Sequence, residues 1–590
     1  MNSRIATPVA LSMAGLALAA AVACGDDRDG FVKAPELVAP QQADEDAGAC
    51  PLQCSLDGRS VIQSCDGTVV ETCPETQACG AATCQEACAA AAADSRSDGC
   101  EFYVQNMAYN DDGCLAAFVV NTSTQPVEIG LSKEGEGLDL SKAVWRTKPG
   151  EATLIEHTGP IPPGESVVLF VAEARTNSPF RVAPGKPPLF CPAGVVAATT
   201  GHALGRTGVG SSLQLTASAP VSAVAIFPFG GAASTKPAAT VLLPVTSWAK
   251  EHVLVEGWEA NEGKPAAQIV ASQDGTEITI IPNKVLLDGH EIKGVPANVP
   301  GKYSLDKGQF FQIYQSSDLT GSIVLSNKPT TVFGGHSCAD VPSNAGACDM
   351  LWQQIPSFEQ WGFEYVGVGY RQRTSSPGEL MPYRIVAARD GTRLDYDPTI
   401  PPGAPTEMNA GDVVVFPVGV NQPFVVRTQD AAHPIYVAAY MHGKGGGFYG
   451  SSSTADQGDP EFVNVVPAGQ WRSSYSFYAD PTYQETSLVV IRGRQRGAFE
   501  DVWLECAGTL EGWAPVGTRS DYEFVRVDLQ RLGGAGQAFG DKVCQTGLHR
   551  MKSEGPFTAT IWGWARAASY AYPGGMSLRK LVDTPLLPVQ

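Results

Sequence analysis

Two similar nine-residue segments occur in the chain, and this repeat constrains the fold more than any other feature. QIVASQDGT at residues 268–276 matches RIVAARDGT at residues 384–392, an offset of 116 residues. Similar beginnings are LLPVTSWAKEHVLV, QIPSFEQWGFEYVGV and NVVPAGQWRSSYSFY, and similar endings are SLQLTASAPVSAVAIFPFGG, GSIVLSNKPTTVFGGH and FVVRTQDAAHPIYVAAYMHG. Repetition at a fixed period indicates consecutive supersecondary units, so we predict about three related units of roughly 115 residues.

The residues between the repeats favour an all-β fold. Gly (63 residues) and Pro (43 residues) punctuate short β-branched or aromatic runs, and long amphipathic helical stretches are absent from the sequence. The expected strands include SVVLFVA (166–172), VSAVAIF (221–227), EITIIP (277–282), FFQIY (310–314), GDVVVFPV (411–418) and YVAAY (436–440). Many short strands separated by turns are typical of antiparallel sandwiches, with a six-bladed propeller as the alternative. Asp-Gly at 274–275 and at 390–391 predicts a hairpin turn in each copy.

The cysteines predict a disulfide-bonded, exported protein. The chain has 15 cysteines, and setting Cys24 aside leaves an even number. Eight of them crowd residues 50–100 and predict a small disulfide module at 50–99, a stalk before the main body: Cys50, Cys54, Cys65, Cys73, Cys79, Cys84, Cys88 and Cys100. SVIQSC and TVVETC flank Asp66-Gly67 as a hairpin, and an Ala-rich helix is expected to place Cys84 and Cys88 on one face.

In the body, three further cysteine pairs are suggested by proximity or by elimination. They are Cys338 with Cys348, Cys506 with Cys544, and Cys114 with Cys191. The connectivity within residues 50–100 stays open.

The N-terminus resembles a bacterial lipoprotein leader. Residues 1–23 carry Arg4 followed by an uncharged, largely apolar run, as in a signal peptide, and Ala21-Val22-Ala23-Cys24 resembles a lipobox whose Cys24 is lipidated. Residues 24–49 are acidic and polar, which predicts a disordered tether. We therefore expect a lipid anchor in a bacterial envelope, at the outer membrane or cell surface.

Residues 100–590 are expected to form the all-β body. Over most of residues 100–580, the chain resembles the IgGFc-binding protein N-terminal domain family. The matching motifs are GSIVLSNKPTTVFGGH, a short Cys-bounded loop and QIPSFEQWGFEY. GDPEFVNVVPAGQW (458–471), DPTYQETSLVVIR (480–492) and WGWARAASYAYPGG (562–575) resemble a lipoprotein subgroup from myxobacteria-like organisms. The resemblance implies a binding role and supplies no catalytic residue.

Two groups of side chains contain metal-binding residue types. His336, Cys338, Asp340 and Asp349 crowd one loop, but a disulfide at Cys338 would remove its thiolate. His442 stands at the matching strand end of the next unit, so both histidines are interpreted as packed residues. Four acids lie near Tyr478 and Tyr483: Asp459, Glu461, Asp480 and Glu485. They are expected to form a polar loop rim, and a calcium site is the alternative. No other metal and no cofactor is expected.

The aromatic C-terminal strands are the candidate binding residues. Side chains alternate along a strand, so Trp562 and Trp564 would share one face, and Tyr570 and Tyr572 would share one face. Exposed, they would form an aromatic ledge that stacks on sugars or binds a protein; the alternative is burial in the core of the last sheet.

Catalytic motifs are not evident in the sequence. Ser577 and Lys580 have S-x-x-K spacing only by chance, and the glycines of GKGGG (443–447) lack the context of a phosphate loop.

These features predict a non-enzymatic, surface-anchored adhesion or binding module. Its expected partners are the membrane, through the lipid, and a glycoprotein, a surface polymer or a cell. The net charge of −20 argues against nucleic acid, because phosphate contacts need Lys and Arg. An extracytoplasmic carbohydrate-active enzyme and a structural envelope component are the alternatives.

Overall fold

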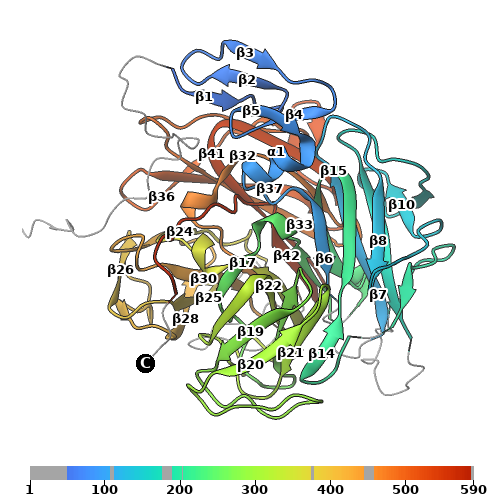
Figure 1. Cartoon of the computed structure of the whole chain (residues 1–590). Helices are drawn as coiled ribbons and strands as arrows, with labels where there is room; N and C mark the ends of the chain where they lie inside the picture. The colour runs from blue at the N-terminus through green and yellow to red at the C-terminus, as the bar shows by residue number, and fades with distance from the viewer. Residues whose placement is uncertain are drawn as a thin grey trace, which may run out of the picture.

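The computed structural model describes residues 50–105, 112–175, 189–201, 203–234, 236–373, 378–443 and 457–586. The predicted signal peptide, the lipidation site Cys24, the acidic tether and most of the 443–447 loop lie outside these residues. Nearly all regular structure in the described part is antiparallel β-sheet, which confirms the all-β prediction (Figure 1).

The N-terminal module, residues 50–99, is a small disulfide-bonded unit. Its elements are β1 (Leu52–Cys54), β2 (Ser60–Gln63), β3 (Val69–Thr72), β4 (Gln77–Gly80), β5 (Thr83–Glu86) and α1 (Ala87–Ala93). The predicted hairpin is confirmed, since β2 pairs with β3 across a turn in which Gly67 has φ +72°. Four disulfides join Cys50–Cys65, Cys54–Cys79, Cys73–Cys84 and Cys88–Cys100.

Two expectations for this module are wrong. Cys84 and Cys88 do not share a helix, because Cys84 lies on β5, where it is bonded to Cys73, and the helix begins only at Ala87. The module is also not a free stalk. It packs on the body through a buried ion pair of 2.7 Å between Asp98 and Arg472.

The body consists of four β segments that follow one another around a centre, from cyan through green and ochre to orange in Figure 1. The first segment is a ten-stranded sheet of β6 (Gly99–Val104), β7 (Gly113–Asn121), β8 (Ile129–Lys133), β9 (Glu136–Gly137), β10 (Val144–Thr147), β11 (Leu154–Glu156), β12 (Ser166–Ala174), β13 (Thr199–Thr200), β15 (Leu213–Phe227) and β16 (Ala238–Val241). The second is an eight-stranded sheet of β14 (Gly208–Ser211), β17 (Ala249–Val253), β18 (Pro265–Ala271), β19 (Thr276–Ile281), β20 (Gly301–Leu305), β21 (Gln309–Tyr314), β22 (Ile323–Ala339) and β23 (Asp349–Ile355).

The third segment is a pair of four-stranded sheets. One contains β24 (Glu364–Gly367), β26 (Thr392–Asp397), β27 (Glu407–Met408) and β29 (Phe424–Thr428), and the other β25 (Leu380–Ala387), β28 (Val413–Gly419), β30 (Ile435–Met441) and β31 (Glu461–Asn464). Aromatic rings fill the space between the two sheets, as in the T-shaped pair Tyr383 and Phe424 at 4.9 Å. This segment is therefore sandwich-like, as predicted.

The fourth segment is a nine-stranded sheet with a small added hairpin. The sheet contains β32 (Arg472–Ala479), β33 (Glu485–Gly493), β34 (Val502–Leu504), β35 (Gly508–Thr509), β36 (Ala514–Val516), β37 (Tyr522–Arg531), β38 (Gly534–Ala535), β41 (Gly547–Ala565) and β42 (Ala568–Pro573), and the hairpin β39 (Ala538–Phe539) and β40 (Lys542–Val543). Three sheets of eight to ten strands are unlike the four-stranded blades of a propeller, which excludes that alternative.

The repeated sequence motifs mark the boundaries between segments. The three beginnings coincide with short 3₁₀ turns that open the second, third and fourth segments: η2 (Val245–Ser247), η3 (Phe358–Gln360) and η5 (Ala468–Gln470). The three endings close the first, second and third segments, and a further turn, η1 (Gly231–Ala233), follows the first ending. The strands that follow the three endings, β16, β23 and β31, lie at the centre, where they and β42 contact one another in a ring.

The predicted Asp-Gly hairpins are wrong, although the turns exist with Gly275 at φ +59° and Gly391 at φ +65°. β18 and β19 do not pair with each other. Both pair with the long strand β22, and β25 and β26 lie in different sheets. The turn therefore carries the chain between faces of the segment instead of closing a two-stranded ribbon.

Candidate functional site

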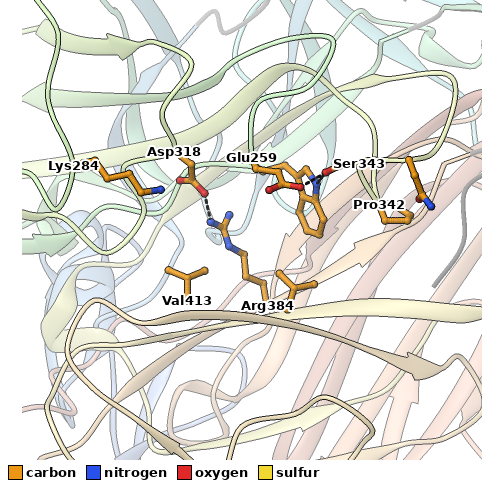
Figure 2. A pocket seen from close by; sticks show the side chains of 10 residues that line it. Glu259, Lys284, Asp318, Pro342, Ser343, Arg384 and Val413 are labelled. Atoms are coloured by element: carbon orange, nitrogen blue, oxygen red, sulfur yellow. Dashed lines mark hydrogen bonds and ion pairs between the residues drawn. The ribbon is translucent and has the colours of Figure 1, made fainter. Parts of the chain in front are cut away.

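A pocket of about 670 Å³ opens between the second and third segments (Figure 2). Its volume lies within the range of about 300–1,000 Å³ that is usual for small-molecule sites. Arg384 and Val413 rise from the lower sheet, on β25 and β28, and Lys284, Asp318 and Glu259 face them from the second segment (Figure 2). The pocket thus exists only where two segments pack together.

Arg384 links the two walls of the pocket. It forms an ion pair of 2.5 Å with Asp318, and Nη1 donates to the backbone oxygen of Glu256 at 2.8 Å. Tyr440 of β30 donates to the backbone oxygen of Gly257 at 2.8 Å. Side chains of the third segment therefore hold the 256–259 loop of the second segment in place.

Burial and neighbouring charges shift the pKa values of two carboxyls beside the pocket in opposite directions. Burial raises the pKa of Glu256 well above its usual value, and the neighbouring Asp318 carboxylate adds to this. Burial alone would also raise the pKa of Asp318, but Arg384 and the hydrogen bonds from Thr320 outweigh it, so this pKa is lowered. Burial would lower the pKa of Arg384, but its acidic partner Asp318 raises it. The pKa values of these two neighbouring carboxyls are therefore displaced in opposite directions, and Asp318 is the one that pairs with Arg384.

The opposite wall is a chain of hydrogen bonds on the 338–348 loop. Trp258 Nε1 donates to Ser343 Oγ at 3.0 Å, and Ser343 Oγ donates to Glu259. The Cys338–Cys348 disulfide closes the loop that carries Ser343. The hydrogen bonds hold Ser343, and the disulfide holds the loop that carries it. This wall of the pocket is therefore formed without a ligand.

Sequence reasoning missed the residues of this pocket. They come from positions 258 to 415, and no local motif joins them. One signal was available in the repeat, where Arg384 stands at the position of Gln268. Gln268 is buried and donates to Gln312 at 2.8 Å, whereas the arginine brings a charge to the equivalent position and pairs with Asp318.

The predicted aromatic ledge is not a surface. Trp562 and Trp564 are each 1% exposed, and Tyr570 and Tyr572 are 0% exposed. Trp562 and Trp564 pack on Tyr370 of the third segment, and Tyr570 packs on Tyr483. Tyr570 and Tyr572 lie on β42, one of the four strands at the centre, and Trp562 and Trp564 lie on β41, which is flanked by β33 and β42.

The cysteines suggested as pairs in the body are joined in the structure. Disulfides connect Cys338–Cys348, Cys506–Cys544 and Cys114–Cys191.

The histidine-rich loop does not assemble a metal centre from its predicted members. In the described residues, the one group of three ligand types within 4.8 Å is Glu262 with Cys338 and Cys348, whose sulfurs are in a disulfide. His336 Nδ1 accepts the backbone N–H of Cys338 at 3.1 Å, and His442 lies 3.0 Å from the backbone oxygen of Gly443. Burial lowers the pKa of each histidine to about 4, so both are neutral. This agrees with the interpretation of both histidines as packed residues.

Asp340 and Asp349 also belong to this loop region. Burial raises the pKa of Asp340 to about 6, and the nearby Glu262 adds to the effect. Asp349 is fully buried at the start of β23.

The four acids considered for calcium are buried instead of forming a loop rim. Asp459, Glu461, Asp480 and Glu485 are between 0% and 6% exposed. They have separate roles: Glu485 pairs with Arg371 at 2.5 Å, and Asp480 accepts hydrogen bonds from Thr482. Burial raises the pKa of Glu461 well above its usual value, despite hydrogen bonds from backbone N–H groups.

In the described residues no helix is long and apolar enough to cross a membrane.

The fold and the pocket define an all-β module with a preformed ligand-sized cavity between segments. The family model described as IgGFc binding protein matches residues 238–563, more than half of the 590-residue chain and all of the pocket. The chain therefore belongs to the IgGFc-binding protein family.

Individual relatives are distant. The human IgGFc-binding protein is 28% identical over 295 residues, which cover 49% of this chain and 5% of the human protein. A solved viral chemokine-binding protein, R17 encoded by rodent gammaherpesvirus Peru, is 10% identical with a TM-score of 0.12, over 58% of this chain and 90% of that one. A likeness at this level carries no argument about fold or function.

Proposed function

We propose that this protein is a surface-anchored recognition module of a bacterial envelope. A lipid on Cys24 holds it at the outer membrane or cell surface, and the β body binds a glycoprotein, a surface polymer or another cell. The observation that carries the proposal is the preformed pocket between the second and third segments, which lies within the residues matched by the family model. The name of the human relative adds the Fc part of IgG, itself a glycoprotein, as one partner to test.

We further propose that the module binds its partner without catalysis. A glycosidase needs two carboxyl groups that both face the scissile bond, separated by about 5–9.5 Å. Glu256 and Asp318 have pKa values displaced in opposite directions, as in an acid and its partner, but Asp318 is held in an ion pair with Arg384. Glu256 is 0% exposed and does not line the pocket, so it has no access to a substrate.

The test is binding of the mature protein to immobilised IgG Fc, to a purified secreted mucin and to intact cells. Val413→Trp fills the pocket from its floor, and Ile400→Trp is the matched control because Ile400 is 55% exposed in the same segment and does not line the pocket. We expect at least one of the three targets to be bound by the wild type and by Ile400→Trp, and lost by Val413→Trp. Binding that survives Val413→Trp, or no binding to any target, overturns the proposal.

The anchor is tested separately. Cells labelled with a radioactive fatty acid should incorporate it into the wild-type chain and not into Cys24→Ser. Labelling of both chains, or of neither, overturns the lipid anchor without affecting the pocket.

A further inference from the structure

We propose that the pocket between the second and third segments takes a neutral, polyhydroxylated ligand, a short uncharged stretch of oligosaccharide. This inference rests on the function proposed above and names the ligand class of the same site.

The charges of the pocket balance. Its ionisable lining residues are two acids, Glu259 and Asp318, and two bases, Lys284 and Arg384. Asp318 and Arg384 neutralise each other in their buried pair, and Glu259 and Lys284 remain as one charge of each sign. A strongly anionic ligand would have to be placed beside Glu259, and a cationic one beside Lys284 and Arg384. The walls therefore favour an uncharged ligand.

The walls also have hydrogen-bonding capacity of both kinds. Within the described part of the chain, no hydrogen bond is formed by the Lys284 ammonium or the Asn344 amide. The Nε of Arg384 is buried without an acceptor, on a side chain that is 3% exposed and lines the pocket. A buried donor that lacks an acceptor is unfavourable unless a ligand or water supplies one. A hydroxyl group serves as donor and as acceptor, so a ligand with several hydroxyls fits such a mixed wall.

The remaining lining is apolar. Val413 and Val415 on β28 form the floor, and Pro342 borders the opposite side. A saccharide ring has polar edges and a face of C–H groups. The ring fits with this face on the two valines and its hydroxyls toward Lys284 and Asn344. A peptide carries charged groups and backbone amides, and the few polar groups of this pocket would not pair with all of them.

The experiment is titration of the mature protein with defined free sugars. The neutral probes are lactose, N,N′-diacetylchitobiose and maltotriose, the acidic probe is sialyllactose, and a mixture of short peptides is the third arm. Saturation-transfer NMR detects contact, and calorimetry gives the dissociation constant. We expect at least one neutral sugar to bind the wild type and to compete with the glycoprotein target.

Two polar variants locate the site and spare the core. Asn344→Ala and Lys284→Ala each remove one hydrogen-bonding group and should weaken the neutral sugar about three- to tenfold. Lys302→Ala is the matched control, because Lys302 is exposed on β20 of the same segment and does not line the pocket. Val413→Trp should abolish sugar binding and Ile400→Trp should retain it.

The outcomes separate the ligand class from the function. Binding of sialyllactose or peptide alone, or no sugar binding while Val413→Trp still loses its protein or cell target, overturns the sugar inference and leaves the recognition pocket standing. Neutral sugar binding that is equal in Asn344→Ala, Lys284→Ala and Lys302→Ala overturns the assignment to this pocket. If Val413→Trp keeps its target, the proposed function itself fails.

Discussion

Replacing Gln353 with leucine should destabilise the whole body, because one amide joins all four segments at the centre of the ring. Gln353 of β23 is 0% exposed, and its Nε2 lies 2.9 Å from the backbone oxygen of Ala239, 3.0 Å from that of Phe462 and 3.1 Å from that of Ala571. These oxygens belong to β16, β31 and β42, the inner strands of the other three segments. Innermost strands have no further strand beside them, so a side chain must satisfy their inward-facing groups.

The magnitude follows from the number of hydrogens. The amide has two N–H groups, which three carbonyl oxygens share. Leucine keeps a similar volume and removes both donors. A buried acceptor left without a partner costs about 1–3 kcal/mol, so the loss should be about 2–6 kcal/mol. If the whole body unfolds cooperatively, with an unfolding entropy of about 2.1 cal/mol/K per residue, this loss lowers Tm by about 2–6 °C.

Urea unfolding with the disulfides intact, followed by tryptophan fluorescence, measures this loss. Gln309→Leu is the control, because Gln309 caps only the exposed turn at Asp306 with a hydrogen bond of 2.9 Å. Gln353→Leu should lower the unfolding midpoint clearly, and Gln309→Leu should change it little. Equal stability of the two variants would refute the central role of the amide.

Three further predictions concern stability. Asp98→Ala leaves the buried Arg472 without its acid, so it should cost about 3–5 kcal/mol and expose the N-terminal module to proteolysis first; uniform proteolysis would contradict this. The pKa of Asp340 is raised from 3.8 to about 6. The protonated carboxyl therefore contributes to the free energy of unfolding below pH 4, and this contribution is lost as the pH rises through 6. Asp340→Asn should therefore match the wild type at pH 4 and exceed it in urea midpoint at pH 7, and the opposite order would contradict the sign. Replacing Cys114 and Cys191 together with serine opens a loop with a sequence separation of 77 and should cost about 4.5 kcal/mol; a change under about 1 kcal/mol in a denaturant titration would contradict the chain-entropy estimate.

Much of the fold could be predicted from the sequence because its signals are local. The apolar runs at 166–172 and 436–440 are strands β12 and β30, and the repeated beginnings mark segment boundaries. The pairing partner of each strand was harder to predict, because pairing depends on contacts between residues far apart in the chain. The Asp274-Gly275 turn is correct as a turn, but β22 is long enough to pair with the strands on both sides of it.

The site could not be predicted for the same reason. Arg384 and Asp318 are 66 residues apart, and their pairing requires two segments to pack in one relative position. The aromatic residues at the C-terminus were considered for binding because they are large and clustered. The tyrosines are buried because β42 lies at the centre, and the tryptophans because β41 packs on Tyr370 of the third segment; nothing within residues 562–572 reveals either.

The measurement that tests the central claim most directly is hydrogen–deuterium exchange of the mature protein with and without the glycoprotein target identified by the binding assays. A ligand in the pocket should protect the backbone amides of residues 256–264, 282–287, 338–348 and 411–416, and Val413→Trp should abolish this protection. Protection confined to other surfaces, such as the N-terminal module at residues 50–99, would contradict the assignment of recognition to this pocket.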